Sequence, residues 1–323
     1  MATNFIQTDN LTYCGREGQG IFSKMIYDLD LASSGITMMD NVKGKTKLYS
    51  GDMGEAWQAY TCAFSPSGQA SLAEATMEPA AIKVNQEQCY DGFWNIWLVE
   101  QTKVSLGGGI PQTFFDWYFN DKLIKTMKKE YQEIFWKGDK AYAGSTKKYL
   151  KVTDGIEKLL KSDANSVKVS NLEAFTIDNI VSQVEAQVLK ANEHAAELDV
   201  DTEDYKVFMN YADVKLLKNA LGKTCCISNS NVAIFQNETL SASGVINIMG
   251  YDVVPTMQSQ NTVIVGPAKN LVLGYDTIDS QSEFKLIDMR ETTGDNMFRV
   301  LAISNIAVGL VLGELFVYAY KAN

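Results

Sequence analysis

The longest regular pattern of apolar and polar positions lies between residues 111 and 137 and predicts a helix. Pro111 stands at a first-turn position, where its missing N–H costs nothing, and Gly138 follows the last residue. At about 100° per residue the apolar side chains fall within one stripe, and lysines and glutamates occupy the other faces. One face is therefore expected to pack on a core, through Leu123, Ile124, Met127, Tyr131, Ile134 and Phe135.

A second helix is predicted between Thr176, a candidate N-cap residue, and about Leu198. Asp178 lies in its first turn, where a carboxylate is favourable. Apolar residues recur at helical spacing on one side, so this helix is expected to pack on a sheet or on another helix. They are Ile177, Ile180, Val181, Val184, Val188, Ala191, Ala195 and Leu198.

The remaining segments mostly have the apolar, β-branched character of strands. A short helix is expected at 213–220, stopped at Gly222. This mixture of helices and strands indicates an α+β fold. The strand-like segments are 205–209, 231–236, 245–254, 261–265, 271–275 and 284–289.

Residues 302–320 are apolar enough to be mistaken for a membrane span, and Gly309 and Gly313 have a small-xxx-small spacing. In that case Asn305 and Glu314 would lie in hydrocarbon, which is costly. Two buried strands broken at a glycine are the favoured interpretation. No membrane contact is expected.

Residues 41–85 are rich in glycine and proline and predict a long hairpin-like excursion after an irregular arm at 1–40. Strand character is found at 57–64 and 80–84, with little apolar material between them. A two-stranded ribbon of this kind is marginal by itself and needs a surface to lie on. In a monomer that surface would be the body of the same chain, and in an assembly it would be the next subunit. For the assembly, the candidate inter-subunit contacts in the loop are Trp57, Tyr60 and Phe64.

Composition and charge limit the classes of function that the chain can have. The chain of 323 residues is 46% hydrophobic and 21% charged, as in an ordinary folded protein of about two domains. Its net charge of −10 means that any contact with DNA must be local. Residues 121–151 stand apart, because they hold 9 basic and 4 acidic side chains. Of the 29 basic residues only Arg16, Arg290 and Arg299 are arginine, which leaves little for bidentate reading of bases.

Cysteine usage and the N-terminus bear on the compartment. The five cysteines form no C-x-x-C pair, and the first ten residues lack the basic and apolar regions of a secretion signal. A reducing environment is expected, with the chain made and kept in a cytosol. The cysteines are Cys14, Cys62, Cys89, Cys225 and Cys226.

The sequence contains no constellation of residues typical of catalysis, a cofactor or a metal site. His194 is the single histidine, so a Ser-His-Asp or Cys-His site would depend on it alone. The Gly107-Gly108-Gly109 run lacks the lysine of a phosphate loop, and a flexible joint is favoured over an anion site. Acidic residues at 193–204 lack the EF-hand spacing. Aromatic residues whose spacing is typical of a core or a subunit contact are Phe93, Trp94, Trp97, Phe115, Trp117 and Trp136.

Several short strings, taken in order, resemble the major capsid proteins of tailed bacteriophages, whose shared fold is called the Hong Kong 97 type. The end of that family's spine helix, with a Gly-Asp loop and a later Gly-Ile, is similar to FWKGDKAYAGSTKKYLKVTDGI (135–156). The family's axial-domain strand and helix resemble YKVFMNYADVKLLKNA (205–220). The strands that follow resemble INIMGYDVVP (246–255) and NTVIVGPAKNLVLGYD (261–276). The loop after Gly138-Asp139 departs from the family, since it is longer and has no proline.

The resemblance implies an α+β fold of the Hong Kong 97 type, with an N-terminal arm, an extended loop, a peripheral domain and an axial domain. The implied division of the chain is an arm at 1–40, an extended loop at 41–85, a peripheral domain at 86–173 with its spine helix at 111–137, an axial domain at 174–276, and strands returning to the peripheral domain at 277–323.

The resemblance also implies a structural, non-enzymatic major capsid protein that self-assembles, as hexamers and pentamers, into an icosahedral shell around double-stranded DNA. Its location would be the virion capsid, after synthesis in the cytoplasm of a bacterial host. Portal, scaffold or decoration proteins would be its partners. In the family the spine helix faces the shell interior, where lysines would neutralise phosphates without reading sequence. The candidates are Lys122, Lys125, Lys128, Lys129 and Lys137, for which a solvated helix face is the alternative.

Two other functions stay open. An encapsulin-like compartment shares the fold but encloses protein cargo, and neighbouring portal and terminase genes would distinguish the viral shell from it. The third function is a two-domain small-molecule enzyme with a cleft between α+β domains. With a single histidine and no cofactor motif, it would depend on carboxylates or lysines.

Overall fold

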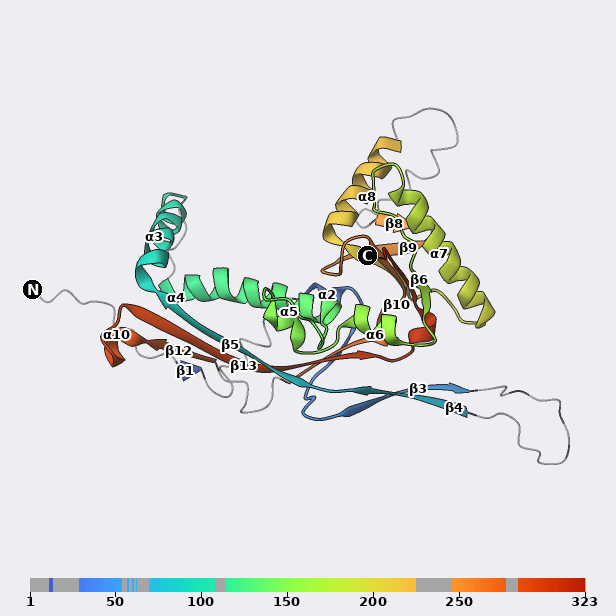
Figure 1. Cartoon of the computed structure of the whole chain (residues 1–323), viewed down its shortest axis with the longest axis horizontal. Coiled ribbons are helices and arrows are strands. Elements are labelled where there is room, and N and C mark those ends of the chain that lie inside the picture. The colour runs from blue at the N-terminus through green and yellow to red at the C-terminus, as the bar shows by residue number, and fades with distance from the viewer. Residues whose placement is uncertain are drawn as a thin grey trace, which may run out of the picture.

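The structure is a computed structural model of the chain, and it describes residues 12–13, 29–53, 57, 60, 62, 70–107, 114–224, 246–276 and 284–322. Figure 1 shows a long platform of strands with a helix lying along it, and a second body of sheet and helices above one end. A two-stranded ribbon leaves the platform below that body. Among the helices of the described residues, none is both long and apolar enough to span a membrane.

The platform is a six-stranded sheet organised by one long strand, β13 (Met297–Leu310). One edge of β13 pairs antiparallel with β5 (Ala80–Cys89) over ten residues. Its other edge pairs first with β12 (Phe284–Asp288) and then with β11 (Leu271–Asp276). The sheet is completed by β1 (Thr12–Tyr13) beside β12 and by β2 (Thr37–Met39), which runs parallel to β11.

The C-terminal apolar stretch forms strands, as predicted. Along β13 alternate side chains are buried, including Phe298, Val300 and Ile306, which is the period-two pattern of a strand with one covered face. A short 3₁₀ turn at Gly313–Leu315 then leads into β14 (Val317–Tyr320), so the break falls at the predicted glycine.

A continuous helix, here called the long helix, lies along the platform from Phe114 to Lys137 (Figure 1). It consists of α4 (Phe114–Trp117), a π-helical segment (Tyr118–Leu123) and α5 (Ile124–Lys137). Residues 111–113 of the predicted helix lie outside the described residues. The predicted apolar face packs on the sheet, with Met127 partly buried and the other members buried: Leu123, Ile124, Tyr131, Ile134 and Phe135.

One helix of the platform, α3 (Tyr90–Leu106), has no counterpart among the predicted elements. Figure 1 shows it rising away from the sheet. Rings at its base hold it, because the centroids of Tyr90 and Phe298 lie 5.0 Å apart and those of Phe93 and Tyr118 lie 5.2 Å apart. Only Tyr90 and Gln101 are buried along the helix, so its sequence lacks the apolar stripe by which helices are predicted.

The second body is a six-stranded sheet in the order β6-β14-β10-β7-β9-β8, packed against two helices (Figure 1). The helices α7 (Ile180–Glu197) and α8 (Tyr211–Thr224) close its core. The strands are β6 (Val167–Val169), β7 (Tyr205–Asn210), β8 (Ile246–Ile248), β9 (Tyr251–Thr256) and β10 (Thr262–Pro267), together with β14.

Some predicted boundaries in this body are wrong. The helix α7 begins at Ile180 rather than at Thr176, because Asn179 is the N-cap and its side-chain oxygen accepts from the Thr176 amide at 2.8 Å. Helix α8 continues through Gly222, since a helix tolerates glycine where nothing else breaks it. The predicted strand 245–254 is two strands, β8 and β9, joined by a left-handed turn at Met249–Gly250. The predicted strand 231–236 lies outside the described residues.

The two bodies share a core. Rings of Trp136 on the long helix and Phe208 on β7 lie 5.4 Å apart between centroids. The helix α6 (Ile156–Ser162) adds Ile156 and Leu160, both fully buried, to the same cluster. The second body is thus fixed to the platform by apolar packing. The short elements not yet named are α2 (Asp30–Ser33), α10 (Met289–Thr292) and 3₁₀ turns at Lys148–Lys151 and Ala268–Asn270.

The ribbon consists of β3 (Thr46–Met53) and β4 (Ala70–Met77), paired antiparallel over eight residues. Its base is anchored by Leu48 and Met77, which pack on Val272 and Ala307 of the platform. The strand predicted at 57–64 is wrong at its described positions, since residues 57, 60 and 62 lie outside any strand. The segment 80–84 is a strand, but it belongs to β5 in the platform, where Val84 lies opposite Ala302.

Candidate assembly surface and lysine band

The ribbon holds itself together by pairing within the chain. Besides the backbone ladder, Lys47 Nζ lies 2.8 Å from Glu74 Oε1 across the two strands, and Lys45 pairs with Glu78 at the base. Figure 1 shows the ribbon extending past the platform without another element beside its outer half. Two strands alone are marginal in water, so this part is suited to lie on another molecule.

Aromatic side chains follow the outer end of β3. Trp57 is 95% exposed and Tyr60 is 91% exposed, whereas aromatic residues usually bury most of their surface. The Tyr60 hydroxyl lies 3.8 Å from Cys62 Sγ. Of the three predicted contact residues, Phe64 lies outside the described residues. Trp57 and Tyr60 therefore offer apolar area that a second molecule can bury.

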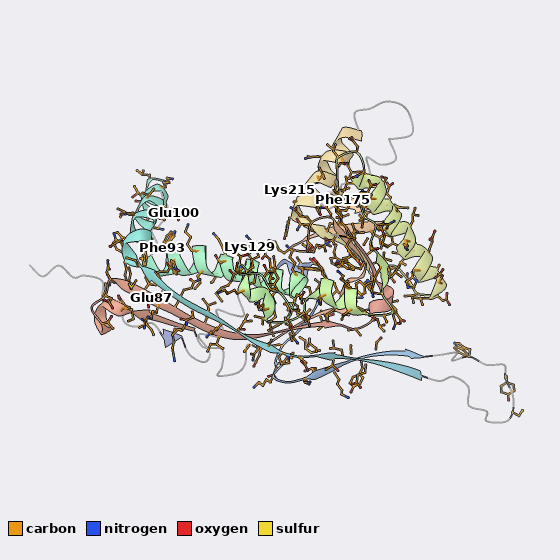
Figure 2. The ribbon with its side chains drawn as sticks, viewed as in Figure 1. Glu87, Phe93, Glu100, Lys129, Phe175 and Lys215 are labelled. Atoms are coloured by element: carbon orange, nitrogen blue, oxygen red, sulfur yellow. The ribbon has the colours of Figure 1, made fainter. Side chains whose placement is uncertain are left out.

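The predicted lysines do not form a single surface. A shallow groove of about 410 Å³ brings together Lys122, Lys125 and Lys129, beside Glu130 and Tyr149. Figure 2 marks Lys129 on the long helix. Lys128 and Lys137 are not among the residues that line this groove. The groove residues are Lys122, Lys125, Thr126, Lys129, Glu130 and Tyr149, and we call them the lysine groove.

Lys122 also fastens α3 to the long helix. Its Nζ lies 3.0 Å from Glu100 Oε1 and 4.9 Å from the ring centroid of Trp117, whose indole N–H donates to the same carboxylate. Hydrogen bonds from Lys122 and Trp117 hold the pKa of Glu100 below its usual range. Part of the positive charge of Lys122 is thus already compensated within the chain.

Lys137 has a different environment, because it is half-buried at the end of α5. Burial lowers the pKa of Lys137. Nearby Lys147 Nζ lies 2.9 Å from Glu133 Oε2, and the Tyr149 hydroxyl donates to the same oxygen at 2.5 Å. Burial by itself would raise the pKa of Glu133, but these two hydrogen bonds bring it below the usual value. These contacts of Glu133 with Lys147 and Tyr149 tie α5 to the segment that follows it.

That turn joins the two glycines of the sequence motif. The Gly155 amide donates to the Gly138 carbonyl at 2.8 Å, directly before α6 begins. Asp139, which follows Gly138, accepts from the Ala141 amide at 2.9 Å and from Lys158 Nζ at 3.3 Å. The longer loop is therefore compatible with a closed, hydrogen-bonded connection between the long helix and α6.

No protein-family profile matches the chain, and no curated protein matches it in sequence. Several solved structures, however, are similar to it in fold. A chain of the satellite phage P4 procapsid, which includes the size determination (Sid) protein, has a TM-score of 0.63 at 14% identity, over 98% of this chain and 94% of that one. The capsid of Myoviridae phage XM1 has a TM-score of 0.52 at 9% identity, over 99% and 96%. A chain of Mycobacterium phage Ogopogo has a TM-score of 0.51 at 11% identity, over 100% of this chain and 97% of that one.

The chain has the Hong Kong 97 type fold of phage capsid proteins. The likeness covers nearly the whole chain, so the predicted α+β capsid fold is confirmed. At sequence identities of 9–14% the structural similarity concerns the path of the backbone only. The roles of side chains in the ribbon and the groove therefore follow from this chain's own contacts.

Within this Hong Kong 97 type fold, the sequence interpretation missed the exposed apolar side chains of α3. Leu106 is 84% exposed and Val99 is 55% exposed, and they continue the partly exposed Trp94, Ile96 and Leu98. A high density of apolar residues between 93 and 106 was the available signal. These apolar residues do not recur at helical spacing, so the sequence pattern did not predict a helix there.

In the residues for which the structure gives a placement, no three His, Cys, Asp or Glu side chains are arranged to hold an ion. His194 lies with Nε2 at 2.9 Å from the Glu314 carbonyl and Nδ1 at 3.6 Å from Glu197 Oε2. The histidine thus links α7 to the turn before β14.

Proposed function

We propose that this chain is the major subunit of an icosahedral viral shell that encloses double-stranded DNA. The observation that carries the proposal is the ribbon. It extends beyond its own platform and leaves Trp57 and Tyr60 more than nine-tenths exposed. The Hong Kong 97 type fold supports the same conclusion, because the solved structures similar to it come from phage capsids. The role is structural rather than enzymatic.

The domain division is part of this proposal. The platform with the long helix is proposed as the peripheral domain, the second body as the axial domain, and the ribbon β3-β4 as the extended loop. The ranges expected from the sequence need correction at their edges, because strands exchange between the two bodies. β11 from the range 174–276 lies in the platform sheet, whereas β6 from 86–173 and β14 from 277–323 lie in the sheet of the second body. Residues 80–85 of the range 41–85 belong to β5 in the platform. In a shell of hexamers and pentamers, many modest ribbon contacts repeated over a closed lattice add to a large total stability.

The lysine groove is proposed as the contact with packaged DNA. Its three lysines lie on one side of the long helix, and the rest of the chain is acidic. Such a groove neutralises phosphates without reading bases, as packaging of any sequence requires. This role requires that the groove face the shell interior.

Assembly is tested by electron microscopy and sedimentation of the purified full-length chain over a range of salt, temperature and protein concentration. Closed icosahedral particles are expected. A strictly monomeric chain under every condition would refute the proposed function.

An encapsulin-like compartment is the competing function, since it shares the fold. Particles purified from the native source distinguish the two by their contents. Nuclease-protected double-stranded DNA and a portal at one vertex are expected for the viral shell. A folded protein cargo with no DNA would favour the compartment. For the viral shell, the proposed location is the virion capsid, after synthesis in the host cytoplasm.

A further inference from the structure

The platform contains a hollow of about 380 Å³ between the long helix, the strand β5 and the turn at Lys148–Lys151. We call it the β5 cavity. Apolar side chains that are only partly buried surround it, namely Ile82, Val84, Met127, Tyr149 and Val152. Part of their apolar surface is therefore open to an occupant, and the volume is sufficient for one side chain of leucine or phenylalanine size.

The cavity lies over an edge strand of the platform sheet. The residues 81–84 that line it belong to β5, and among the described residues β5 pairs with β13 alone. The backbone N–H and C=O groups on the other edge of β5 thus have no strand partner in that part of the chain. Such an edge is a template for another extended chain, which adds to the sheet by backbone hydrogen bonds.

The β5 cavity adjoins the lysine groove, because Glu130 and Tyr149 line both. Lys148 lines the cavity, Lys125 and Lys129 line the groove, and all three lysines are exposed. Positive charge therefore lies beside an apolar hollow. An occupant that carries carboxylates next to an apolar side chain complements both parts of this surface.

Glu130 is the only acidic side chain among the residues that line the two hollows. It is partly buried, and burial together with the nearby Glu133 raises the pKa of Glu130. Glu130 is therefore neutral over a wider pH range than an exposed glutamate, and it opposes an acidic occupant less. The lining as a whole favours negative charge.

We infer that the β5 cavity and the lysine groove together bind an extended acidic segment of another protein, paired with the free edge of β5. Side chains alternate along a strand, so one apolar side chain enters the cavity while carboxylates two positions away lie toward Lys129 and Lys148. Duplex DNA has no apolar side chain for the cavity, and a small molecule has no backbone for the strand edge. Only an extended peptide uses all three features.

The segment and DNA compete for one surface, because the lysine groove is also the proposed contact with DNA. This consequence rests on the proposed function. In a shell that fills with DNA, the acidic segment has to leave before phosphates reach Lys125 and Lys129. The segment would thus neutralise the groove during assembly and release it for the genome.

Binding of synthetic peptides to the purified full-length chain tests the inference. The probe is the acetylated and amidated peptide TTETLTETT, in which threonine provides strand propensity, leucine is the anchor and a glutamate lies two positions to each side. Fluorescence anisotropy of the labelled peptide at low salt gives the Kd. Replacement of leucine by threonine is expected to raise the Kd at least about tenfold. Replacement of both glutamates by lysine is expected to abolish binding, because like charges then meet.

Backbone pairing has a signature of its own. Successive N–H groups of a strand point to opposite edges, so only one alternate set of peptide amides can donate to β5. N-methylation of that set is expected to abolish binding, whereas N-methylation of the other set leaves most of it. Equal effects of the two sets would overturn the strand pairing.

Variants of the protein locate the site. Lys129→Gln combined with Lys148→Gln is expected to raise the Kd roughly three- to tenfold. The matched control combines Lys215→Gln with Lys218→Gln, two exposed lysines of α8 that line neither hollow, and should leave the Kd unchanged. Val84→Phe occupies the cavity with a residue of high strand propensity. It should weaken binding of the leucine peptide but not of its threonine form, and circular dichroism checks that each variant folds.

The outcomes separate this inference from the proposed function. The inference is overturned if the wild-type chain does not bind TTETLTETT, or if the changes at Lys129 and Lys148 leave the Kd unaltered. Wild-type shells in which the free edge of β5 pairs with a strand of a neighbouring copy also overturn it. In each case a chain that assembles around DNA keeps the proposed function. A chain that binds the peptide at this site but never assembles refutes the proposed function and leaves the inference standing.

Discussion

The amide of Gly155 donates to the carbonyl of Gly138 at 2.8 Å, and this contact closes the turn between the long helix and α6. A Cβ atom added at Gly138 would lie 2.3 Å from the Thr153 carbonyl oxygen. One added at Gly155 would lie 2.6 Å from the Gly138 amide nitrogen. Both glycines have ordinary negative φ angles, so the requirement is for space and not for an unusual backbone conformation.

Gly155→Ala is therefore expected to lower the free energy of unfolding by about 2–3 kcal/mol or more, because backbone atoms on both sides would have to move. The measurement is urea unfolding of the unassembled subunit. Gly222→Ala is the matched control. No atom lies within 4 Å of its added Cβ, and alanine in a helix is expected to stabilise by up to about 1 kcal/mol. Equal stability of the two variants would contradict the prediction.

Assembly and folding are expected to depend on different ribbon residues. Tyr60→Ala removes a side chain that is 91% exposed, so subunit stability should change by less than about 0.5 kcal/mol while shell formation weakens. Leu48→Ala removes a buried anchor at the ribbon base and should cost about 2–5 kcal/mol of subunit stability. Thermal unfolding and light scattering measure the two effects. A large loss of subunit stability from Tyr60→Ala would show that the ribbon packs on its own subunit.

If the lysine groove binds DNA, substitution of its lysines should weaken the salt dependence of DNA affinity. The double variant Lys125→Gln and Lys129→Gln should reduce the magnitude of the slope of log affinity for double-stranded DNA against log salt by about 1.8, if each lysine contacts one phosphate. Filter binding of disassembled hexamers or opened shells provides the slope. Lys215→Gln is the control, since Lys215 lies on α8 of the second body and is not among the residues that line the lysine groove. Equal slopes for wild type and double variant would leave these lysines as a solvated helix face.

Glu157 predicts a pH effect. Its Oε1 accepts from the Ser259 amide at 2.5 Å and its Oε2 from the Ser259 hydroxyl at 2.8 Å, which ties α6 to the loop before β10. Burial raises the pKa of Glu157 above its ordinary value of 4.5. The folded chain then binds this proton more tightly than the unfolded chain, so stability is lost as pH rises from about 4.5 through the raised pKa.

Glu157→Gln should remove that loss, because the amide can accept from the Ser259 amide and donate to its hydroxyl. Its stability relative to wild type is expected to increase with pH across this window. Ser259→Ala removes a hydrogen bond that lowers the pKa of Glu157. In this variant the loss of stability with rising pH should therefore continue to a higher pH than in the wild type. Urea unfolding between pH 4 and pH 7 measures both. Parallel curves for all three proteins would contradict the prediction.

Much of the platform could be predicted because its signals are local. Gly138 and a one-sided apolar stripe predict the described part of the long helix, and a glycine lies at the break between β13 and β14. The resemblance through Gly138 and Gly155 was informative because those glycines meet in space, a relationship that a fold preserves when most side chains have changed.

The missed features depend on contacts distant in sequence. Helix α3 is held by rings from Phe298 and Tyr118, not by a stripe of its own. The ribbon strands lie at 46–53 and 70–77 because Leu48 and Met77 find Val272 and Ala307, which are more than 190 residues away along the chain. The lysines of the groove were named, but the pairing of Lys122 with Glu100 and the burial of Lys137 follow only from the folded structure.

The placement of β13 and β14 has a consequence for biosynthesis. The first lies at the centre of the platform sheet, and the second lies between β6 and β10 in the other sheet, although both come after residue 296. A nascent chain that has not yet reached Met297 lacks an interior strand in each sheet. Fragments that end before Met297 therefore cannot complete the core of either body, so we expect only full-length chains to present folded surfaces to one another.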